Sequence, residues 1–142
     1  KKIKFHSVKG LWRDNLINNI EAPLRSEVSD YKPFEELKIL IKHNPFFRLE
    51  CKDMSTIIHS MNKGAGINWH HDGKWKYGAT YYLNRRWGEH WGGEFMFKDK
   101  NSHGYLPCVG NSLAIVKTPL EHKVNPVLSA IVPRLTIQLF IS

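Results

Sequence analysis

Two side chains of a kind that binds metal ions stand two positions apart in the segment Trp69-His70-His71-Asp72. Residues i and i+2 of an extended segment project to the same side, so His70 and Asp72 can share one ion while His71 points away. Two histidines and a carboxylate form a facial triad, which leaves open positions on an octahedral iron. An isolated His-x-Asp pair also occurs in ordinary loops, so the prediction of a metal centre depends on a third ligand from a distant strand.

His122 is the best candidate for that ligand among the eight histidines, because it opens the run 122–127 (HKVNPV) shortly before a final strand-like segment. In that segment the residues Leu135, Ile137, Leu139 and Ile141 alternate with Arg134, Thr136, Gln138 and Phe140. Arg134 and Thr136 therefore share a face directed away from the aliphatic row. A guanidinium inside a barrel needs an anion, and its planar fork suits a carboxylate. The alternative is a surface arginine at the start of a strand.

The elements that must hold these residues change in character along the chain. From Leu11 to about Leu40 the apolar spacing predicts helix, with Asp14 as a cap and Pro23 near the end of the first segment. The apolar positions of this first segment are Leu16, Ile17, Ile20 and Leu24. A second, short helix is predicted through Glu35, Glu36, Leu37 and Leu40.

From about Ser55 the pattern changes to short runs rich in β-branched and aromatic residues, separated by Gly, Asn, Asp and Lys. The predicted strands are Ser55 to Met61, Asn68 to His71, Gly78 to Leu83, Gly93 to Phe97, Ser112 to Lys117, His122 to Val127 and Arg134 to Ile141. Short strands of this kind close into a barrel or a double-sheet jelly roll. We therefore expect a mainly β fold, a barrel or a double-sheet jelly roll, with N-terminal helices packed on one sheet; the motifs described below favour the cupin-like jelly roll (a double-stranded β-helix). Residues 1–54 would form the helical support and residues 55–142 the core of one domain.

Composition and charge exclude several classes of protein. The 142 residues, 42% hydrophobic and 24% charged, suit one globular domain, and no stretch approaches the roughly 18 apolar residues of a membrane span. Cys51 and Cys108 follow no disulfide or zinc pattern, which favours a reducing, cytoplasmic location. The formal charge of +8 suits an acidic partner or simply solubility, but the basic residues are scattered, so we expect neither a nucleic-acid nor a membrane partner. Because the sequence begins at Lys1 without Met, we expect the N-terminus of the protein to lie upstream.

Further motifs surround the candidate metal ligands in the second half of the chain. In order, the stretches are Gly64-Ala65-Gly66 ahead of Trp69-His70-His71-Asp72, Tyr81-Tyr82-Leu83-Asn84 with Trp87, Gly92-Gly93-Glu94, Pro107 with Gly110, and His122-Lys123-Val124-Asn125-Pro126 followed by Arg134. Through these stretches the region from Ser55 to Ser142 resembles the Fe(II)- and 2-oxoglutarate-dependent dioxygenases, specifically the prolyl-4-hydroxylase-like branch.

The resemblance implies that Fe(II) is bound by His70, Asp72 and His122. It also implies that Arg134 pairs with the distal carboxylate of 2-oxoglutarate and that Tyr82 supports the same carboxylate. Thr136 stands where related enzymes often place a hydroxyl. The implied cofactors are Fe(II) and the cosubstrate 2-oxoglutarate, with ascorbate supporting turnover.

The chain departs from the family pattern in two places. Ser60 stands ten residues before His70, where close prolyl hydroxylases tend to carry a tyrosine near the cosubstrate. The interval from His122 to Arg134 is 134 − 122 = 12 positions, somewhat longer than in close relatives, which implies a larger turn around Leu128 to Pro133.

Aromatic and basic residues near the metal-binding segment are the candidates for substrate contacts. Trp75, Tyr77, Arg85 and Trp87 would line a substrate groove; the alternative is that they pack a rim. The resemblance implies hydroxylation of a prolyl residue in a peptide or protein. The alternative substrate is a free amino acid or another small metabolite.

Two other functional classes are alternatives. The nucleic-acid demethylating branch usually carries a second arginine six residues after the first, where this chain has Phe140. A non-catalytic jelly-roll binding module, or a cupin-like metal protein without 2-oxoglutarate, would have no need of Arg134 and Tyr82 opposite the metal.

Overall fold

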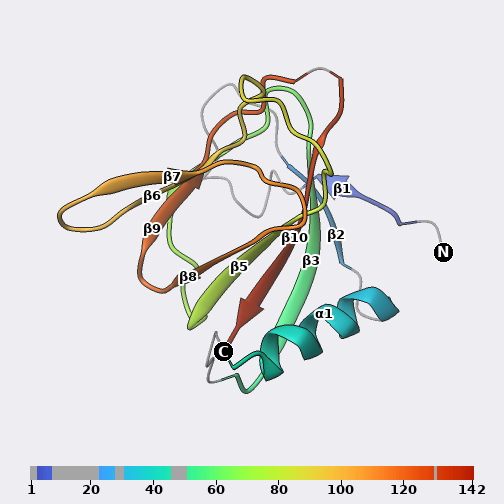
Figure 1. Cartoon of the computed structure of the whole chain (residues 1–142), viewed down its shortest axis with the longest axis vertical. Helices are drawn as coiled ribbons and strands as arrows, with labels where there is room; N and C mark the ends of the chain where they lie inside the picture. Colours follow the sequence, from blue (N-terminus) through green and yellow to red (C-terminus); the bar gives the residue numbers. More distant parts are fainter. Residues whose placement is uncertain (1–2, 8–22, 28–30, 46–50, 130) are drawn as a thin grey trace.

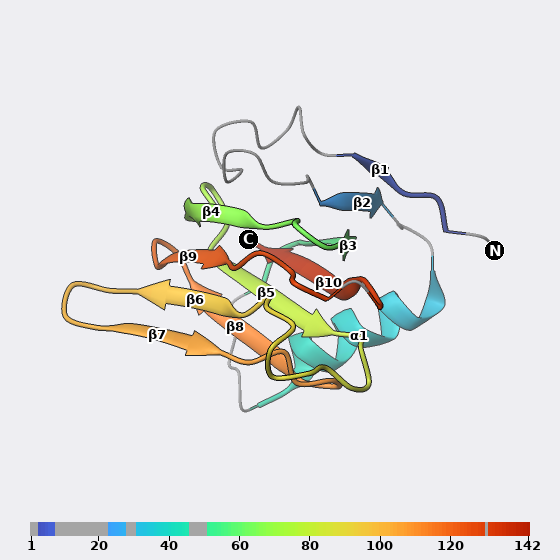
Figure 2. The ribbon, with the colours of Figure 1, turned by 90° about the horizontal axis from the view of Figure 1, so that it is seen from above.

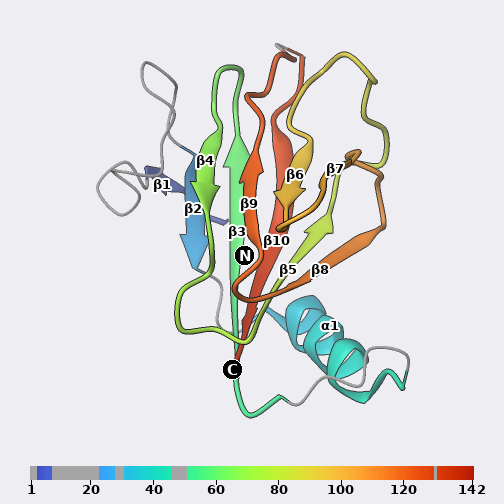
Figure 3. The same ribbon diagram turned by 90° about the vertical axis from the view of Figure 1, so that its left-hand side faces the viewer.

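The structure, a computed structural model, describes residues 3–7, 23–27, 31–45, 51–129 and 131–142, apart from the side chain of residue 27. Within these ranges the chain forms two antiparallel β-sheets. The six-stranded sheet has the order β1 (His6–Ser7), β2 (Leu24–Glu27), β3 (Met54–Met61), β10 (Arg134–Ile141), β5 (Tyr77–Tyr82) and β8 (Leu113–Lys117). The four-stranded sheet has the order β4 (Ile67–His70), β9 (Glu121–Val124), β6 (Phe95–Lys98) and β7 (His103–Leu106). The sheets face each other (Figures 1 and 3), so the predicted mainly β jelly roll is confirmed.

The central strand β10 shows the alternation expected from its sequence. Leu139 and Ile141 are buried on one face of the six-stranded sheet, where α1 (Lys32–His43) packs through Phe34 and Ile41. Pro33 fits the first turn of this helix, where a missing N–H loses no hydrogen bond. Figure 2 shows α1 lying along the outside of this sheet. The aliphatic row of β10 therefore faces the helix, and the alternate residues face the space between the sheets.

The inner face of the six-stranded sheet is arranged in steps along β10. Strand register places Arg134 opposite Met61, and Thr136 between His59 of β3 and Tyr82 of β5. The next two steps are Gln138, between Ile57 and Thr80, and Phe140, between Ser55 and Gly78. Successive steps are roughly 6.6 Å apart, because each advances two residues along a strand. Arg134 and Thr136 thus share the inner face, as the sequence predicts.

The N-terminal part of the chain differs from the prediction at Leu24. This residue lies in β2, opposite Ser60 of β3, and not in a helix. Pro23 precedes it, and a proline in a helix interior loses a hydrogen bond and clashes with the preceding turn. The rest of the first predicted helix falls largely on residues 8–22, outside the described residues, whereas the second lies within α1. None of the described helical segments has the length and apolarity needed to cross a membrane.

The strands predicted from residue 55 onward are present, but their ends and number differ. The strand predicted over 122–127 ends at Val124 in β9, because Pro126 has no N–H for a β ladder. The sequence pattern does not predict β7, whose residues are mostly exposed and include Gly104. Only the pairing of β7 with β6 makes it a strand.

Candidate active site

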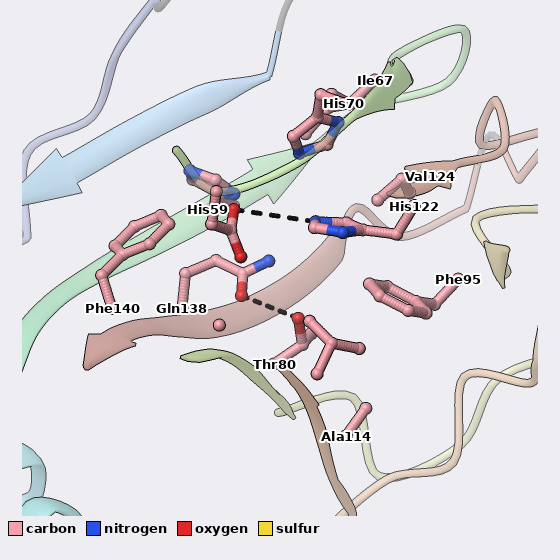
Figure 4. A pocket seen from close by; sticks show the side chains of 13 residues that line it. His59, Ile67, His70, Thr80, Phe95, Ala114, His122, Val124, Gln138 and Phe140 are labelled. Carbon is pink, nitrogen blue, oxygen red and sulfur yellow. Dashed lines mark hydrogen bonds and ion pairs between the residues drawn. The ribbon is translucent and has the colours of Figure 1, made fainter. Parts of the chain in front are cut away.

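The three predicted metal ligands lie together between the sheets. His70 ends β4, His122 is directly opposite it on β9, and Asp72 follows two residues after β4. One ligand atom from each residue lies within 4.8 Å of the others, and His122 Nε2 is 3.7 Å from Asp72 Oδ1. The two imidazole centroids are 4.3 Å apart, and Figure 4 shows both rings at one cavity. This set has the donor chemistry of a two-histidine, one-carboxylate centre.

Backbone carbonyl groups orient both imidazoles. His70 Nδ1 lies 2.7 Å from the carbonyl oxygen of Asn68, and His122 Nδ1 lies 3.0 Å from that of Leu120. Because a carbonyl oxygen only accepts, each Nδ1 donates a proton and each Nε2 keeps its lone pair for a metal. Burial lowers the pKa of His70, and the neighbouring His122 lowers it further, which favours the neutral form that binds metals.

Gly78 on β5 makes room for the carboxylate of Asp72. A Cβ atom at position 78 would lie 1.9 Å from Asp72 Oδ2 and 3.0 Å from its Cγ. Any side chain there would displace the carboxylate from its position beside the two histidines. The sequence pattern predicts Gly78 only as the start of a strand, because nothing in the local sequence reveals which side chain approaches it.

A second polar site lies deeper in the barrel, around Arg134. Its side chain is fully buried (0% exposed), and its guanidinium carbon is 5.1 Å from the centre of the Tyr82 ring. Arg134 Nε and Nη1 donate to sulfur atoms, Cys108 Sγ at 3.4 Å and Met61 Sδ at 3.7 Å, which are weak acceptors. In the described part of the chain, no carboxylate pairs with this arginine.

Three buried polar atoms of this second site have no hydrogen-bond partner within the described residues: Arg134 Nη2, the Tyr82 hydroxyl oxygen and Thr136 Oγ1. A buried cation and buried hydroxyls are costly when they are left unpaired. A carboxylate placed among them would accept a hydrogen bond from each. The residues present therefore fit a carboxylate-bearing ligand.

The residues around Arg134 stay uncharged and allow its guanidinium group to keep an unneutralised positive charge. Burial raises the pKa of Tyr82 against the opposing effect of the arginine, so the phenol keeps its proton and can donate. Burial likewise raises the pKa of Cys108, so the neighbouring thiol stays uncharged and does not neutralise the guanidinium. Gly93 (φ 77°) allows the close approach of its backbone, because a Cβ there would lie 2.7 Å from Arg134 Cδ.

Several residues that line the cavity in front of the metal ligands are not among the site residues that the sequence predicts. They include His59, Thr80, Phe95, Val116, Gln138 and Phe140. On β5 and β10 these residues follow the alternation that already contains Tyr82 and Arg134. That alternation is the signal by which Thr80, Gln138 and Phe140 could be found from the sequence.

His59 is buried among positive charges beside this cavity. Burial and the nearby Arg134 and Arg25 lower its pKa to about 3, so it is a neutral imidazole. Ser60, which stands where the resemblance expects a tyrosine, pairs with Leu135 and lies on the other face of β3. The register therefore places His59 near the arginine and directs Ser60 away from it.

The four predicted substrate residues do not form one groove. Trp75 packs 5.8 Å from the ring of Phe140, which lines the cavity. Tyr77 lies on the opposite face of the sheet and packs in the core beside the helix. Trp87 packs against the cluster around Met61, and its Nε1–H donates to the carbonyl oxygen of Gly92 at 2.8 Å. Arg85 is exposed, so only Trp75 lies beside the cavity.

Comparisons with known proteins show the family and the fold of the chain. Residues 56–142 match the family model of the 2OG-Fe(II) oxygenase superfamily. No curated protein matches the sequence. A prolyl-4-hydroxylase from Pseudomonas putida is similar in structure, with a TM-score of 0.68 and 18% identity over 88% of this chain and 71% of that chain.

Two further solved structures have the same fold. A prolyl hydroxylase from Trichoplax adhaerens, in complex with a hypoxia inducible factor oxygen degradation domain peptide fragment, has a TM-score of 0.69 and 19% identity over 88% of this chain and 64% of that chain. An oxidoreductase of the 2OG-Fe(II) oxygenase family from Burkholderia pseudomallei has a TM-score of 0.67 and 15% identity over 84% and 66%. This chain thus spans about two-thirds of the length of these structures. Since the family model matches more than half of its residues, the chain belongs to the 2OG-Fe(II) oxygenase superfamily.

Proposed function

We propose that the chain is an Fe(II)- and 2-oxoglutarate-dependent hydroxylase that acts on a prolyl residue in a peptide or protein. The observation that carries the proposal is the position of Arg134, buried without a carboxylate partner within the described residues, in the same barrel as His70, Asp72 and His122. A metal-binding site and a carboxylate-binding site in one interior are what a chelating keto acid with a second carboxylate requires.

In this proposal His70, Asp72 and His122 hold Fe(II). Bound Fe(II), 2-oxoglutarate and dioxygen together supply the oxidation, which yields succinate, carbon dioxide and a hydroxylated substrate. Arg134 Nη2, with the hydroxyl groups of Tyr82 and Thr136, binds the far carboxylate of the keto acid. The walls of the barrel orient the ligands and exclude water.

The prolyl substrate is supported by the fold shared with two prolyl hydroxylases, one of them solved with a peptide fragment. A second candidate function is hydroxylation of a free amino acid or another small metabolite. It is favoured by the dispersal of Tyr77, Arg85 and Trp87, which leaves no continuous groove of the predicted residues beside the cavity.

The cofactors can be tested without knowing the substrate. We would titrate the iron-loaded protein with 2-oxoglutarate under anaerobic conditions and follow the weak visible charge-transfer band of the iron-chelated keto acid. The wild type should show the band, and Arg134→Met should need on the order of 100-fold more 2-oxoglutarate, because a charge-assisted hydrogen-bond pair is lost. Arg85→Met, an exposed arginine, should behave like the wild type.

Failure of the band to appear in wild-type protein with iron bound would refute the proposal and favour a binding module or a cupin-like metal protein. If the band appears, the substrate is tested by mass spectrometry on proline-containing peptides and on free amino acids. A gain of one oxygen atom in a peptide at proline supports the prolyl hydroxylase. The same gain in a free amino acid alone supports the second candidate.

A further inference from the structure

Gln138 lines the cavity in front of the metal ligands, and the function proposed above gives it no role. It lies on the inner face of β10, one step beyond Thr136 in the direction away from Arg134, and it is half-buried. Strand register places it directly opposite Thr80 on β5. Thr80 Oγ1 donates a hydrogen bond of 2.7 Å to Gln138 Oε1. One end of the amide is therefore fixed.

Fixing Oε1 leaves the amide N–H groups of Gln138 as donors toward the cavity. Figure 4 shows the nitrogen of this amide on the side that faces His122. Among the described residues, the one hydrogen bond of this amide is the bond that Oε1 accepts from Thr80, and the nitrogen donates to none of them. Because the side chain is only half-buried, this donor can be solvated in the free protein, unlike the buried atoms around Arg134.

The spacing of the steps along β10 indicates which ligand atom this donor would meet. The guanidinium of Arg134 lies against the ring of Tyr82, one step deeper in the barrel than Gln138. An extended five-carbon dicarboxylate spans about one such step. With its far carboxylate at Arg134, a keto acid would bring its near carboxylate to the level of Gln138.

We propose that Gln138 is a positioning residue for the cosubstrate, with its Nε2–H donating to the near carboxylate of 2-oxoglutarate. Thr80 acts through Gln138 by holding the amide with its nitrogen toward the cavity. This inference rests on the proposed function, since it needs a keto acid bound at the metal. Arg134, Tyr82 and Thr136 would bind the far carboxylate of 2-oxoglutarate. Gln138, from the same sheet, would contact its near carboxylate, at the end of the molecule that reacts.

The test measures the affinity of the iron-loaded protein for 2-oxoglutarate, again from the anaerobic charge-transfer band. Gln138→Met keeps the length of the side chain and removes the donor, and it should raise the midpoint of the titration roughly 10- to 100-fold, the cost of one hydrogen bond to a charged group. Thr80→Val releases the amide and should give a smaller increase. Thr56→Val is the matched control, because Thr56 is a buried threonine of the same sheet that does not line the cavity.

A parallel titration with Fe(II) alone, and thermal unfolding of each metal-free variant, separate the outcomes. Equal 2-oxoglutarate midpoints for wild type and Gln138→Met would overturn the inference. A contact between the amide and the organic substrate would then be the alternative role. Weaker iron binding with an unchanged 2-oxoglutarate midpoint would also overturn it, because the amide would then support Asp72. A wild-type protein without the band would refute the proposed function itself, a result distinct from both of these.

Discussion

The sharpest prediction concerns Gly78, because the structure provides the size of the perturbation. In Gly78→Ala the new Cβ would lie 1.9 Å from Asp72 Oδ2, whereas such contacts essentially never fall below 3.0 Å. Asp72 Oδ2 must therefore move by at least 3.0 − 1.9 = 1.1 Å, which turns or shifts the carboxylate. Metal–ligand distances tolerate only about 0.2 Å, so Asp72 cannot keep its place beside His70 and His122. We expect the affinity for Fe(II) to fall roughly 10- to 100-fold or more.

The assay is an anaerobic Fe(II) titration of Gly78→Ala, with Asp72→Ala as the reference for complete loss of the carboxylate. Denaturant unfolding in the presence of a chelator serves as the control. The metal-free variant should be about as stable as the wild type, because the only group displaced is the end of one side chain. Iron affinity within twofold of the wild type, with unchanged stability, would show that Gly78 has no part in placing Asp72.

Three further predictions concern residues around the cosubstrate site. The pKa of His59 is lowered to about 3 in the folded protein, so its contribution to stability is present above pH 6.5 and is lost as the pH falls toward 3. Over this range the free energy of unfolding of the metal-free protein should fall by up to roughly 1.4 kcal/mol per pH unit. His59→Gln should reduce this pH dependence. Tyr82→Phe should leave the free energy of unfolding unchanged or raise it by about 1 kcal/mol, because the buried hydroxyl has no partner among the described residues. The same change should weaken 2-oxoglutarate binding about tenfold. A loss of stability with unchanged binding would contradict this reasoning. The side chain of Asn84 accepts a hydrogen bond from the N–H of Leu135 and donates one to the carbonyl oxygen of Pro133. Asn84→Ala should therefore lower the free energy of unfolding by about 1–3 kcal/mol and weaken 2-oxoglutarate binding at the adjacent Arg134. Equal stability of the variant and the wild type in denaturant would refute this prediction.

The parts of the site that the sequence predicts are those set by strand alternation and by motif. His70 and Asp72 are two apart, and Arg134 and Thr136 are two apart, so each pair shares a side once the segment is extended. The fold class follows from the short strands after residue 55. These inferences need no knowledge of which strand pairs with which.

The parts of the site that the sequence does not predict depend on the pairing of strands that are distant in the sequence. His59 joins the site because β3 pairs with β10 in a register that sets it opposite Thr136 and turns Ser60 outward. Tyr77, beside the predicted metal-binding segment, lies on the helix side because the alternation on β5 gives the cavity to Gly78 and Thr80. Proximity along the sequence misleads in such cases, since neighbours in a strand point to opposite faces.

The distribution of the site over the two sheets bears on how the barrel is held together. The metal ligands come from β4, the loop after it and β9, all on the side of the four-stranded sheet. The unpartnered groups of Arg134, Tyr82 and Thr136 all come from β10 and β5 of the six-stranded sheet. In the free protein these groups therefore have no hydrogen-bond partner among the described residues of either sheet. A ligand that chelates the metal at one end and meets Arg134 at the other joins the two sheets, so in the proposed enzyme the binding of iron and of 2-oxoglutarate each favours the other through one bridging molecule.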